Sequence, residues 1–548
     1  MGAPALLQGL LLHSASRTPQ ALALTDGAVS LSYAGLQLQV EQFASALMGL
    51  GLERGERVGI YLEKRSEAVV ASFGSAAAGG VMVPINPLLK PEQVAFILRD
   101  CNVRLLLTSP PRHALLAGVL PTCHDLRHVL LTSAPQDGAA QTFAPAQAGL
   151  GRDAVALLHW SALAQFAPRA GHRVLDTDMA AILYTSGSTG SPKGVVLSHR
   201  NMVVGARSVA SYLGNHAQDT LLAALPLSFD AGFSQLTTAF HVGARVVLLN
   251  YLLPHEVLKT LLREGITGLT AVPPLYIQLA QLDWPVQIGH TLRYFANTGG
   301  RLPQETLRAL RQRAPGAKPY LMYGLTEAFR STYLAPEEVE RRPDSIGRAI
   351  PDAEILVLRE DGTPCAVDEP GELVHRGALV GLGYWNDAER TAQRYKPLPA
   401  GVAGRQAGLV LSEYAVFSGD TVRQDAQGFL YFVGRRDEMI KSSGYRISPT
   451  EVEEVLYATR QVDECMAFGV AHPTLGQAIQ VIATRATPAI ADAAPVTPAQ
   501  LLEACRIHMP AYMVPAAIHL VAGPLPRNPN GKIDRALLIR QWRQQHGP

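Results

Sequence analysis

The sequence lacks several features that would point to other classes of protein. Its five cysteines show no C-x-x-C spacing, which argues against a zinc site and a disulfide framework and is typical of free thiols in a reducing compartment. The formal net charge is only +2, and no basic run is interleaved with aromatic residues, so no nucleic-acid partner is expected. The longest uncharged window, residues 68–89, contains prolines and a Gly-Gly pair, so we expect no transmembrane segment. Without a signal-peptide pattern as well, a cytoplasmic protein is expected.

Short apolar runs alternate with helical stretches between about residue 20 and residue 280. Examples of the runs are residues 57–62, 103–108, 180–184 and 244–249. Continuous apolar strands separated by helices are typical of parallel sheets that are covered on both faces. Near residue 355 the pattern changes, because an Asp-Gly turn at 361–362 lies between extended runs and predicts antiparallel hairpins.

The chain is too long for one hydrophobic core, so we expect more than one domain. A boundary is predicted at FVGRRD, residues 432–437, beyond which SPTE at 448–451 is typical of a capping box that opens a helix. The predicted domains are residues 1–434 and residues 435–548. The predicted fold class is α/β, with parallel sheets flanked by helices and a β subdomain in the first domain.

The loop YTSGSTGSPKGVVLSHRN, residues 184–201, is rich in glycine and hydroxyl residues and contains one lysine. Glycines let the backbone bend and expose its N–H groups, while Lys193 adds a positive charge, so the loop suits a polyphosphate. The order Pro192-Lys193-Gly194 is not that of the Walker loop, in which Gly-Lys-Ser/Thr opens a helix. A Gly/Ser surface loop without a function has a similar composition, and the length and order of this one favour a function.

This loop closely resembles the phosphate-binding signature of the AMP-forming adenylate-forming enzymes. That family includes acyl-CoA synthetases, adenylation domains of nonribosomal peptide synthetases and beetle luciferases. Further motifs follow in the family's order: NTGG (297–300), YGLTE (323–327), SGD (418–420), GRRD (434–437) and NGK (530–532). The resemblance covers roughly residues 20–540. It implies a large N-terminal domain and a small, mobile α+β C-terminal domain.

The resemblance also implies the first reaction and the residues that perform it. A carboxylate would attack the α-phosphate of ATP and release pyrophosphate, so the site needs cations and hydrogen-bond donors. Glu327 would hold Mg²⁺, which prefers oxygen ligands, and Thr326 would contact phosphate. Asp420 would accept hydrogen bonds from the ribose hydroxyls, and Arg435 would contact ribose or phosphate. The residues implied around the phosphates and the adenine are Thr185, Ser186, Gly187, Ser188, Thr189, Gly190, Lys193, Gly299, Gly300, Tyr323 and Gly324.

By the same resemblance, the C-terminal domain supplies the catalytic lysine and then rotates for a second reaction. Lys532 would bridge the carboxylate and the α-phosphate region. A thiol would then replace AMP, with Asp437 as the hinge, Gly444 leaving room for the pantetheine arm and Arg446 assisting. For Lys441, in the same segment, a role and a solvated charge remain equally open.

Two positions depart from the pattern of many acyl-CoA synthetases. Asp230 follows a phenylalanine where an aromatic residue is usual, and adenylation domains for amino acids often use aspartate there to bind the substrate ammonium. Arg330 falls where apolar residues usually line the acyl pocket. Unpaired buried charges are costly, so a plain long-chain fatty acid is disfavoured. Asp230 and Arg330 could instead pair with each other, and both readings stay open.

The sequence thus predicts an AMP-forming ligase that takes ATP, Mg²⁺, CoA and a small carboxylic acid. CoA is the expected acceptor because no carrier domain or Gly-Gly-x-Ser site follows Lys532. The alternative is a stand-alone enzyme that loads an amino acid or acyl group onto a separate acyl or peptidyl carrier protein, which Asp230 favours. A non-catalytic nucleotide-binding protein would be expected to lack one of the charged motif residues, and all are present. His199 is expected to form part of the cap of the next helix and not to act as a base.

Overall fold

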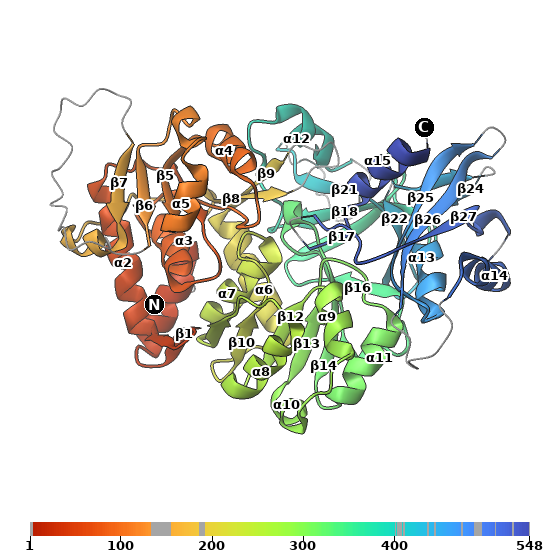
Figure 1. The fold of residues 1–548 in the computed structure, drawn as a ribbon. Coiled ribbons are helices and arrows are strands. Elements are labelled where there is room, and N and C mark those ends of the chain that lie inside the picture. The colour runs from red at the N-terminus through yellow and green to blue at the C-terminus, as the bar shows by residue number, and fades with distance from the viewer. Residues whose placement is uncertain are drawn as a thin grey trace.

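The structure is a computed structural model. It describes residues 4–132, 155–185, 192–399, 402, 408, 411–435, 438–442, 445–472, 475–486, 496–509, 511–528 and 531–546, with the backbone alone at residues 441, 445, 446, 476 and 512. Figure 1 shows the large N-terminal part on the left and the small C-terminal domain, in blue, on the right. Within these residues, no helix is long and apolar enough to cross a membrane.

The first sheet is parallel through most of its N-terminal part. Only the hairpin at its edge departs from this, because β1 and β2 are antiparallel. The strands, in spatial order, are β2 (Val29–Ser32), β1 (Leu22–Asp26), β11 (Arg245–Leu248), β10 (Thr220–Ala223), β12 (Gly268–Ala271), β13 (Tyr294–Asn297) and β14 (Lys318–Tyr323).

A second sheet lies beside the first and is also mainly parallel. The two strands at one edge of this sheet, β19 and β9, are antiparallel, and they carry residues of the site described below. The strands, in spatial order, are β19 (Gly383–Tyr384), β9 (Lys193–Ser198), β8 (Met179–Thr185), β4 (Val81–Pro84), β3 (Arg57–Tyr61), β5 (Val103–Thr108), β6 (His128–Leu131) and β7 (Ala156–His159). The runs predicted at 57–62, 103–108, 180–184 and 244–249 are therefore strands, with ends that differ by at most one residue.

A layer of helices fills the space between the two sheets and forms the largest core with them. These helices are α1 (Leu7–Arg17), α2 (Tyr33–Gly49), α3 (Ser66–Ala78), α6 (His199–Leu213) and α7 (Asp230–Val242). Side chains alternate between the two faces of a strand: Leu221 packs into this core, whereas Leu222 packs on the other side of the sheet. Both faces are buried, which explains why these strands read as continuous apolar runs.

Other helices cover the outer faces of the two sheets. Those on the outer face of the first sheet, visible at the bottom of Figure 1, are α8 (Pro254–Glu264), α9 (Pro273–Ala280), α10 (Val286–Thr291) and α11 (Gln304–Arg313). Those on the second are α4 (Pro91–Asp100) and α5 (Pro110–Leu116). Short 3₁₀ turns occur at η1 (Leu120–Thr122), η2 (Trp160–Gln165), η3 (Thr326–Ala328), η4 (Pro336–Glu338) and η5 (Ala511–Met513).

Beyond β14 the first sheet continues as antiparallel strands, which form the predicted β subdomain. The strand pair that begins near residue 355 and encloses the Asp-Gly turn is antiparallel, as predicted. The elements are β15 (Thr332–Leu334), β16 (Ser345–Ala349), β17 (Ala353–Leu358), β18 (Gly371–Gly377), β20 (Tyr395–Pro397), β21 (Tyr414–Gln424), β22 (Leu430–Arg435) and the helix α12 (Ala388–Arg394).

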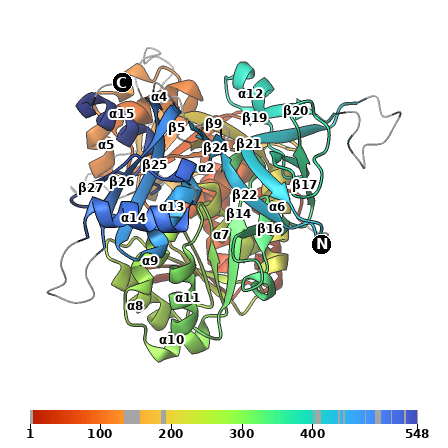
Figure 2. The same ribbon diagram turned by 90° about the vertical axis from the view of Figure 1, so that its right-hand side faces the viewer.

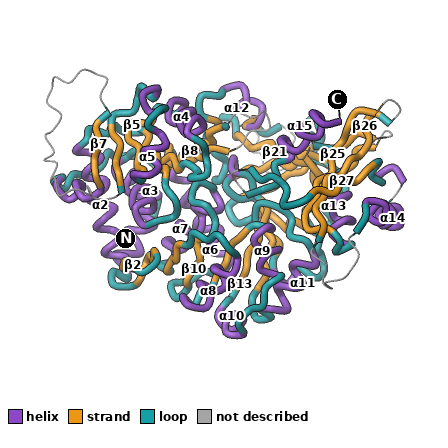
Figure 3. The backbone as a smooth tube through the Cα atoms, in the orientation of Figure 1, coloured by secondary structure: helices purple, strands orange, loops and turns teal. Residues whose placement is uncertain are grey.

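A separate small sheet with its own helices forms the C-terminal domain, which faces the viewer in Figure 2. Helices α13 and α14 pack on one face of this sheet and α15 on the other; Figure 3 shows them, in purple, around the orange strands. The elements are β23 (Ile440–Ser442), β24 (Tyr445–Ile447), α13 (Pro449–Ala458), β25 (Val462–His472), β26 (Gly476–Arg485), α14 (Pro498–His508), β27 (Ala517–Val521) and α15 (Arg535–His546). The predicted fold class is confirmed: a large α/β N-terminal domain and a smaller α+β one.

Of two predictions about helix caps, one is confirmed in part and one is wrong. Ser448 is the N-cap of α13 and Pro449 its first residue, as predicted, but the Ser448 side chain makes no cap hydrogen bond, and its buried hydroxyl lacks a partner. His199 does not cap α6, because Ser198 and Asn201 form that capping box. Instead, the N–H of Leu7 at the start of α1 donates to Nδ1 of His199 over 3.1 Å.

Candidate active site

The candidate active site lies where the parallel strands β12, β13 and β14 end. These strands are neighbours, and they end at Ala271, Asn297 and Tyr323. Ligands of open α/β sheets bind at the carboxyl ends of the strands, because the backbone groups of the turns that follow are not paired with neighbouring strands. The glycine pair follows β13 and the turn η3 follows β14, so two of the sequence motifs meet at this edge.

A buried cluster of three side chains occupies one side of the site. Lys193 Nζ lies 3.2 Å from Glu327 Oε1 and 3.0 Å from the hydroxyl of Tyr384. The Tyr384 hydroxyl donates to the same Glu327 oxygen over 2.5 Å. The Lys193 ammonium also lies over the Tyr384 ring, 4.5 Å from its centroid. Strand pairing holds the cluster, because β19, which carries Tyr384, pairs with β9, which begins at Lys193.

The carboxylate of Glu327 is kept ionised by this cluster. Burial alone would raise the pKa of Glu327, whose exposed fraction is 8%. The Lys193 ammonium and the Tyr384 hydroxyl more than offset burial, so the pKa lies below its usual range. Glu327 is thus a buried carboxylate that keeps its negative charge.

Threonines lie on either side of the same cluster. Thr185 is the last residue of β8 and pairs across the ladder with Lys193. Its hydroxyl is buried without a hydrogen-bond partner, which is unusual for such a group and leaves it available to a ligand. Thr326 opens η3 directly before Glu327, and Gly324 lies between β14 and that turn. A Cβ at Gly324 would lie 3.2 Å from the Cα of Arg330, so the strand end and the turn pack closely.

A second polar group lies in the β subdomain. Asp420 and Arg435 are cross-strand partners on β21 and β22, and Arg435 Nε lies 3.6 Å from Asp420 Oδ1. The hydroxyl of Tyr323 donates to Oδ2 of the same aspartate. Burial raises the pKa of Asp420, while Tyr323 and Arg435 oppose that effect. The Tyr323 ring packs at 6.3 Å from that of Phe432.

The glycine pair after β13 leaves space beside these groups. Gly299 has a φ of +76°, which a residue with a side chain adopts only with strain. A Cβ there would lie 3.2 Å from Val272 Cγ1 and 3.6 Å from Lys532 Cε. Asn297 fixes the turn, because its side-chain amide donates to the carbonyl of Gly300 over 2.7 Å. The other amide atom of Asn297, its oxygen, is buried without a partner.

Lys532 extends from the C-terminal domain into this site. It belongs to a short turn in which its N–H donates to Asn528 Oδ1 over 3.1 Å, and Arg527 pairs with Ile533 as an isolated bridge. The residue as a whole is solvent-exposed, and its side chain approaches Gly299 of the N-terminal domain. Packing of protein around its ammonium lowers the pKa of Lys532, and the carboxylates of Asp230 and Asp420 act in the opposite direction.

Asp230 and Arg330 form an ion pair with each other. Arg330 Nη1 lies 3.0 Å from Asp230 Oδ2 and also donates to the carbonyl of Phe329 over 3.1 Å. Arg330 is buried, with 2% exposure. The turn that directs it is unusual, because Phe329 has a φ of +58° and its ring fills the space above Gly205, where a Cβ would lie 2.3 Å away. The two charges that the sequence left open therefore neutralise one another.

Among the residues that the structure describes, two ion pairs connect the domains next to this site. Arg301, which follows the glycine pair, contacts Asp344 and also Glu454 of α13. Glu305 of α11 contacts Arg460, which follows α13. Burial raises the pKa of Glu454 to about 7, although Arg301 opposes that effect. These ion pairs form in the same arrangement of the two domains in which the Lys532 side chain approaches Gly299.

Several predicted site residues fall outside the described part of the chain. They are Ser186, Gly187, Ser188, Thr189, Gly190, Asp437 and Gly444. For Lys441 and Arg446 only the backbone is described, at β23 and β24, where they are register partners. Their predicted roles therefore stay predictions.

Sequence reasoning missed Tyr384 and Asn297. Tyr384 lies in the run GLGYW, for which no motif was recognised, and its contact with Lys193 spans 191 positions. Asn297 was noted only as the first letter of the NTGG motif, without a role of its own. A signal for it exists, because an asparagine that ends an apolar strand and precedes a Gly-Gly turn is typical of a side chain that bonds to the turn backbone.

Comparison with known families agrees with this geometry. A family model described as "AMP-binding enzyme" matches residues 11–385, and one described as "AMP-binding enzyme C-terminal domain" matches residues 451–532. The chain belongs to the family of AMP-binding enzymes. Within this family it is an AMP-forming ligase, as the relatives below also indicate.

Relatives of two kinds match the chain over its whole length. An L-proline–[L-prolyl-carrier protein] ligase of Pseudomonas fluorescens is 30% identical, over 98% of this chain and 99% of the relative. A long-chain-fatty-acid–CoA ligase of Bacillus subtilis is 26% identical, over 98% and 95%. Among solved structures, o-succinylbenzoate coenzyme A synthetase from Bacillus subtilis, in complex with ATP and magnesium ion, matches with a TM-score of 0.78 at 25% identity, over 97% of this chain and 99% of that one. The relatives thus include both carrier-protein ligases and CoA ligases, and similarity favours neither acceptor for this chain.

Proposed function

We propose that the protein activates a small carboxylic acid with ATP and transfers the acyl group to the thiol of CoA. In the first step a carboxylate oxygen forms a bond to the α-phosphorus while the bond to the pyrophosphate oxygen breaks. In the second step the thiol sulfur forms a bond to the acyl carbon, the thiol proton is released and AMP leaves. The observation that carries the proposal is the approach of Lys532 from the C-terminal domain to Gly299, which follows the strand next to the one that precedes Glu327.

The charges of the described residues suit two reacting anions. Lys193 would face the β- and γ-phosphates together with the loop at 186–191, and the unpartnered hydroxyl of Thr185 would donate to a phosphate oxygen. Thr326 would contact phosphate from the other side. Lys532 would lie between the substrate carboxylate and the α-phosphate, where a compact ammonium reduces the repulsion of the two anions.

The nucleoside would lie over the glycine pair. The carboxylate oxygens of Asp420 would accept hydrogen bonds from the ribose hydroxyls. These bonds would replace the hydrogen bond that the Tyr323 hydroxyl now donates to Asp420. The Tyr323 ring would then be free to stack on adenine beside Gly299 and Gly300, with Gly324 behind it. Arg435 would remain with Asp420 and keep it ionised.

The residues present also fit Mg²⁺. The ion prefers oxygen ligands, keeps several waters and is usually held by one or two carboxylates together with phosphate oxygens. Glu327 supplies one ionised carboxylate, and no group of three or more metal-ligating side chains exists in the described residues. When bound, Mg²⁺ would shield the negative charge of the phosphates. Lys193, already in contact with Glu327, would lie beside it.

The pairing of Asp230 with Arg330 supports CoA over an amino-acid-loading reaction. The main support for carrier loading was an aspartate that could bind a substrate ammonium, and here that aspartate already has a buried cationic partner. Carrier loading remains the second candidate, because a relative of nearly the same length and 30% identity is a prolyl-carrier protein ligase. In either case Gly444 and Arg446 are proposed to serve the second step, after rotation about Asp437.

The test is ATP–pyrophosphate exchange with a panel of fatty, aryl, hydroxy and amino acids, followed by thioester formation with CoA or with a phosphopantetheinylated carrier protein. Exchange with acids that lack an amino group, followed by acyl-CoA formation, supports the proposal. Exchange confined to amino acids, with transfer only to the carrier, replaces it by the second candidate. Absence of exchange across the panel rules out both.

A further inference from the structure

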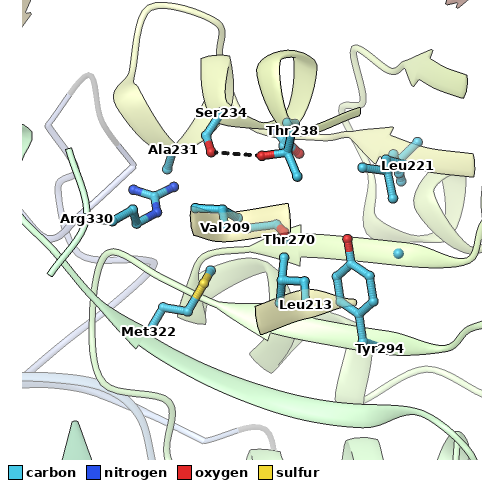
Figure 4. A pocket seen from close by; sticks show the side chains of 13 residues that line it. Val209, Leu213, Leu221, Ala231, Ser234, Thr238, Thr270, Tyr294, Met322 and Arg330 are labelled. Atoms are coloured by element: carbon cyan, nitrogen blue, oxygen red, sulfur yellow. Dashed lines mark hydrogen bonds between the residues drawn. The ribbon is translucent and has the colours of Figure 1, made fainter. Parts of the chain in front are cut away.

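The interior of the N-terminal domain beside the site is closely packed. Figure 4 shows a small pocket there, with Arg330 at one end and Leu221 and Tyr294 at the other. Its volume is about 20 Å³, which holds about one water molecule. No part of a substrate is therefore assigned to this pocket. The feature that bears on the binding of ATP lies elsewhere, at the end of the outer helix α4.

Helix α4 ends at Asp100, whose backbone carbonyl binds two side chains from a distant segment. The last carbonyl groups of a helix have no partner within the helix, so they need donors from elsewhere. The carbonyl of Asp100 accepts from Trp385 Nε1 over 2.8 Å and from Asn386 Nδ2 over 2.7 Å. These two residues directly follow Tyr384, which contacts Lys193 in the site. The end of α4 is thus bonded to the segment that carries Tyr384.

The side chain of Asp100 contacts the strand that leads into the glycine-rich loop. The hydroxyl of Tyr184 donates to Asp100 Oδ2. Tyr184 lies on β8 directly before Thr185, and it pairs across the ladder with Gly194 of β9. Its ring lies over that glycine, since a Cβ at Gly194 would be only 3.1 Å from Tyr184 Cζ. Asp100 is therefore also bonded to the strand whose last residue, Thr185, carries the buried hydroxyl without a partner.

Burial and a neighbouring cation hold these contacts in place. Burial raises the pKa of Tyr184 well above its usual range, so the hydroxyl keeps its proton and donates to the carboxylate. The Arg57 guanidinium lies over the Trp385 ring, 5.2 Å from its centroid. Arg57 also donates to the carbonyl of Cys101, the residue that follows Asp100. The indole of Trp385 is thus held both at its N–H and on its face.

We propose that Asp100 is a positioning residue for the binding of ATP. The inference rests on the proposed function, since it takes Thr185, Lys193 and Tyr384 to lie on the phosphate side of the site. Strand β19, which carries Tyr384, has only two residues and lies at the edge of its sheet, so its ladder with β9 is short. Asp100 gives this segment a second attachment. Because Asp100 also binds Tyr184, one residue fixes Thr185 and Tyr384 relative to each other on either side of Lys193.

The experiment measures the dissociation constant of Mg·ATP by calorimetry, without an acid substrate, for the parent and for Tyr184→Phe. The variant loses the hydroxyl that binds Asp100 and keeps the ring over Gly194, so the constant should rise about tenfold. Tyr61→Phe is the matched control, because Tyr61 is a buried tyrosine of the same sheet whose hydroxyl donates to the carbonyl of Leu89. Parent-like binding by Tyr184→Phe, or equal weakening in both variants, overturns the inference and leaves the proposed function intact. Absence of binding by the parent overturns both.

A second pair of variants separates positioning from folding. Asp100→Asn keeps an oxygen that accepts from Tyr184, whereas Asp100→Leu removes it, and both keep the backbone carbonyl. Asp100→Leu should weaken the binding of Mg·ATP about tenfold, and Asp100→Asn should stay within about twofold of the parent. In exchange assays, Asp100→Leu should raise KM for ATP and leave KM for the acid unchanged. Equal binding by the two variants, or an equal rise of both KM values in Asp100→Leu, would refute the inference.

Discussion

The two halves of the active site are held in place in different ways. Lys193, Glu327 and Tyr384 contact one another at 2.5–3.2 Å inside the N-terminal domain, and strand pairing fixes their positions. Lys532 lies on an exposed turn of a separate small domain and extends from it to Gly299 of the N-terminal domain. In the proposed function, the charges for the pyrophosphate side would thus be part of the N-terminal domain, whereas the charge for the reacting carboxylate would be delivered by the other domain.

The ion pairs that hold the C-terminal domain, and with it Lys532, against the N-terminal domain are weak by comparison. Arg301–Glu454 and Glu305–Arg460 are partly exposed ion pairs, and such pairs contribute about 0–1 kcal/mol each. The C-terminal domain has its own hydrophobic clusters, so undocking leaves its folding intact. Weak contacts of this kind agree with the proposal that the C-terminal domain rotates after the first reaction, which would let the thiol enter.

Removing the delivered charge should have the largest effect. Lys532→Ala should lower the rate of acyl-adenylate formation about 10²- to 10³-fold, because the carboxylate and the α-phosphate then lose their shared cation. Thioester formation from supplied acyl-adenylate should change little. The check is to measure both reactions, with Lys259→Ala on the exposed side of α8 as control. An equal loss in both reactions would contradict a role confined to the first step.

A substitution in the cluster of Lys193, Glu327 and Tyr384 should have a smaller effect on the rate, but it should also change the dependence of the rate on Mg²⁺. Tyr384→Phe removes the hydroxyl that bonds to both Lys193 and Glu327 while keeping the ring beneath the ammonium. Adenylation should fall about tenfold, and the Mg²⁺ concentration for half-maximal rate should rise, because Glu327 loses a fixed orientation. The melting temperature should stay near that of the parent and of the exposed control Tyr414→Phe. An unchanged Mg²⁺ dependence would show that Tyr384 does not position Glu327.

The pH dependence of adenylation should reveal how Asp230 acts on the delivered charge. Lys532 works as an ammonium, and its pKa is lowered by packing of protein around it, so the rate should fall as pH rises through that lowered value. The Asp230 carboxylate acts in the opposite direction and raises this pKa, so Asp230→Asn should move the alkaline limb to lower pH. Rate–pH profiles of the parent and the variant provide the check. Lys532→Arg, if active, should lack the limb within the same range, and a limb that Asp230→Asn leaves in place would mean that another group titrates.

The smallest effect is expected at the domain contact. Arg301→Met removes the ion pair with Glu454 across the domains and the one with Asp344, each of about 0–1 kcal/mol, so adenylation should fall by at most about fivefold. Thioester formation from supplied acyl-adenylate should stay constant or rise, because undocking becomes easier. The ratio of the two rates is the readout, with Arg311→Met, whose ion pair with Glu340 lies within the N-terminal domain, as control. A fall in both rates would place Arg301 in the site itself.

The same contrast explains what the sequence could predict. Strands such as β5 were predicted correctly because both faces of the sheet are buried and the runs are continuously apolar. The Asp-Gly turn predicted the antiparallel region for a local reason as well. The start of α13 was predicted correctly, with Ser448 as N-cap and Pro449 as the first residue, but the side-chain bond of the capping box does not form.

In the site, the motif residues were predicted by resemblance, but their contacts were not. Nothing local links Tyr384 to Lys193, since β19 must pair with β9 before they meet. The pairing of Asp230 with Arg330 was left open because it spans 100 positions and depends on the turn at Phe329, whose positive φ no pattern signals.

The most direct test of the account joins the two domains chemically. Arg301→Cys and Glu454→Cys would place thiols at the contact, with Cys365→Ser removing the native cysteine that is not buried. A short bis-maleimide then holds Lys532 in the site, and both reactions are measured before and after cross-linking. The account predicts that cross-linking leaves ATP–pyrophosphate exchange nearly unchanged and abolishes thioester formation. Full thioester formation in the cross-linked protein would contradict it, because the delivered charge would then never need to leave.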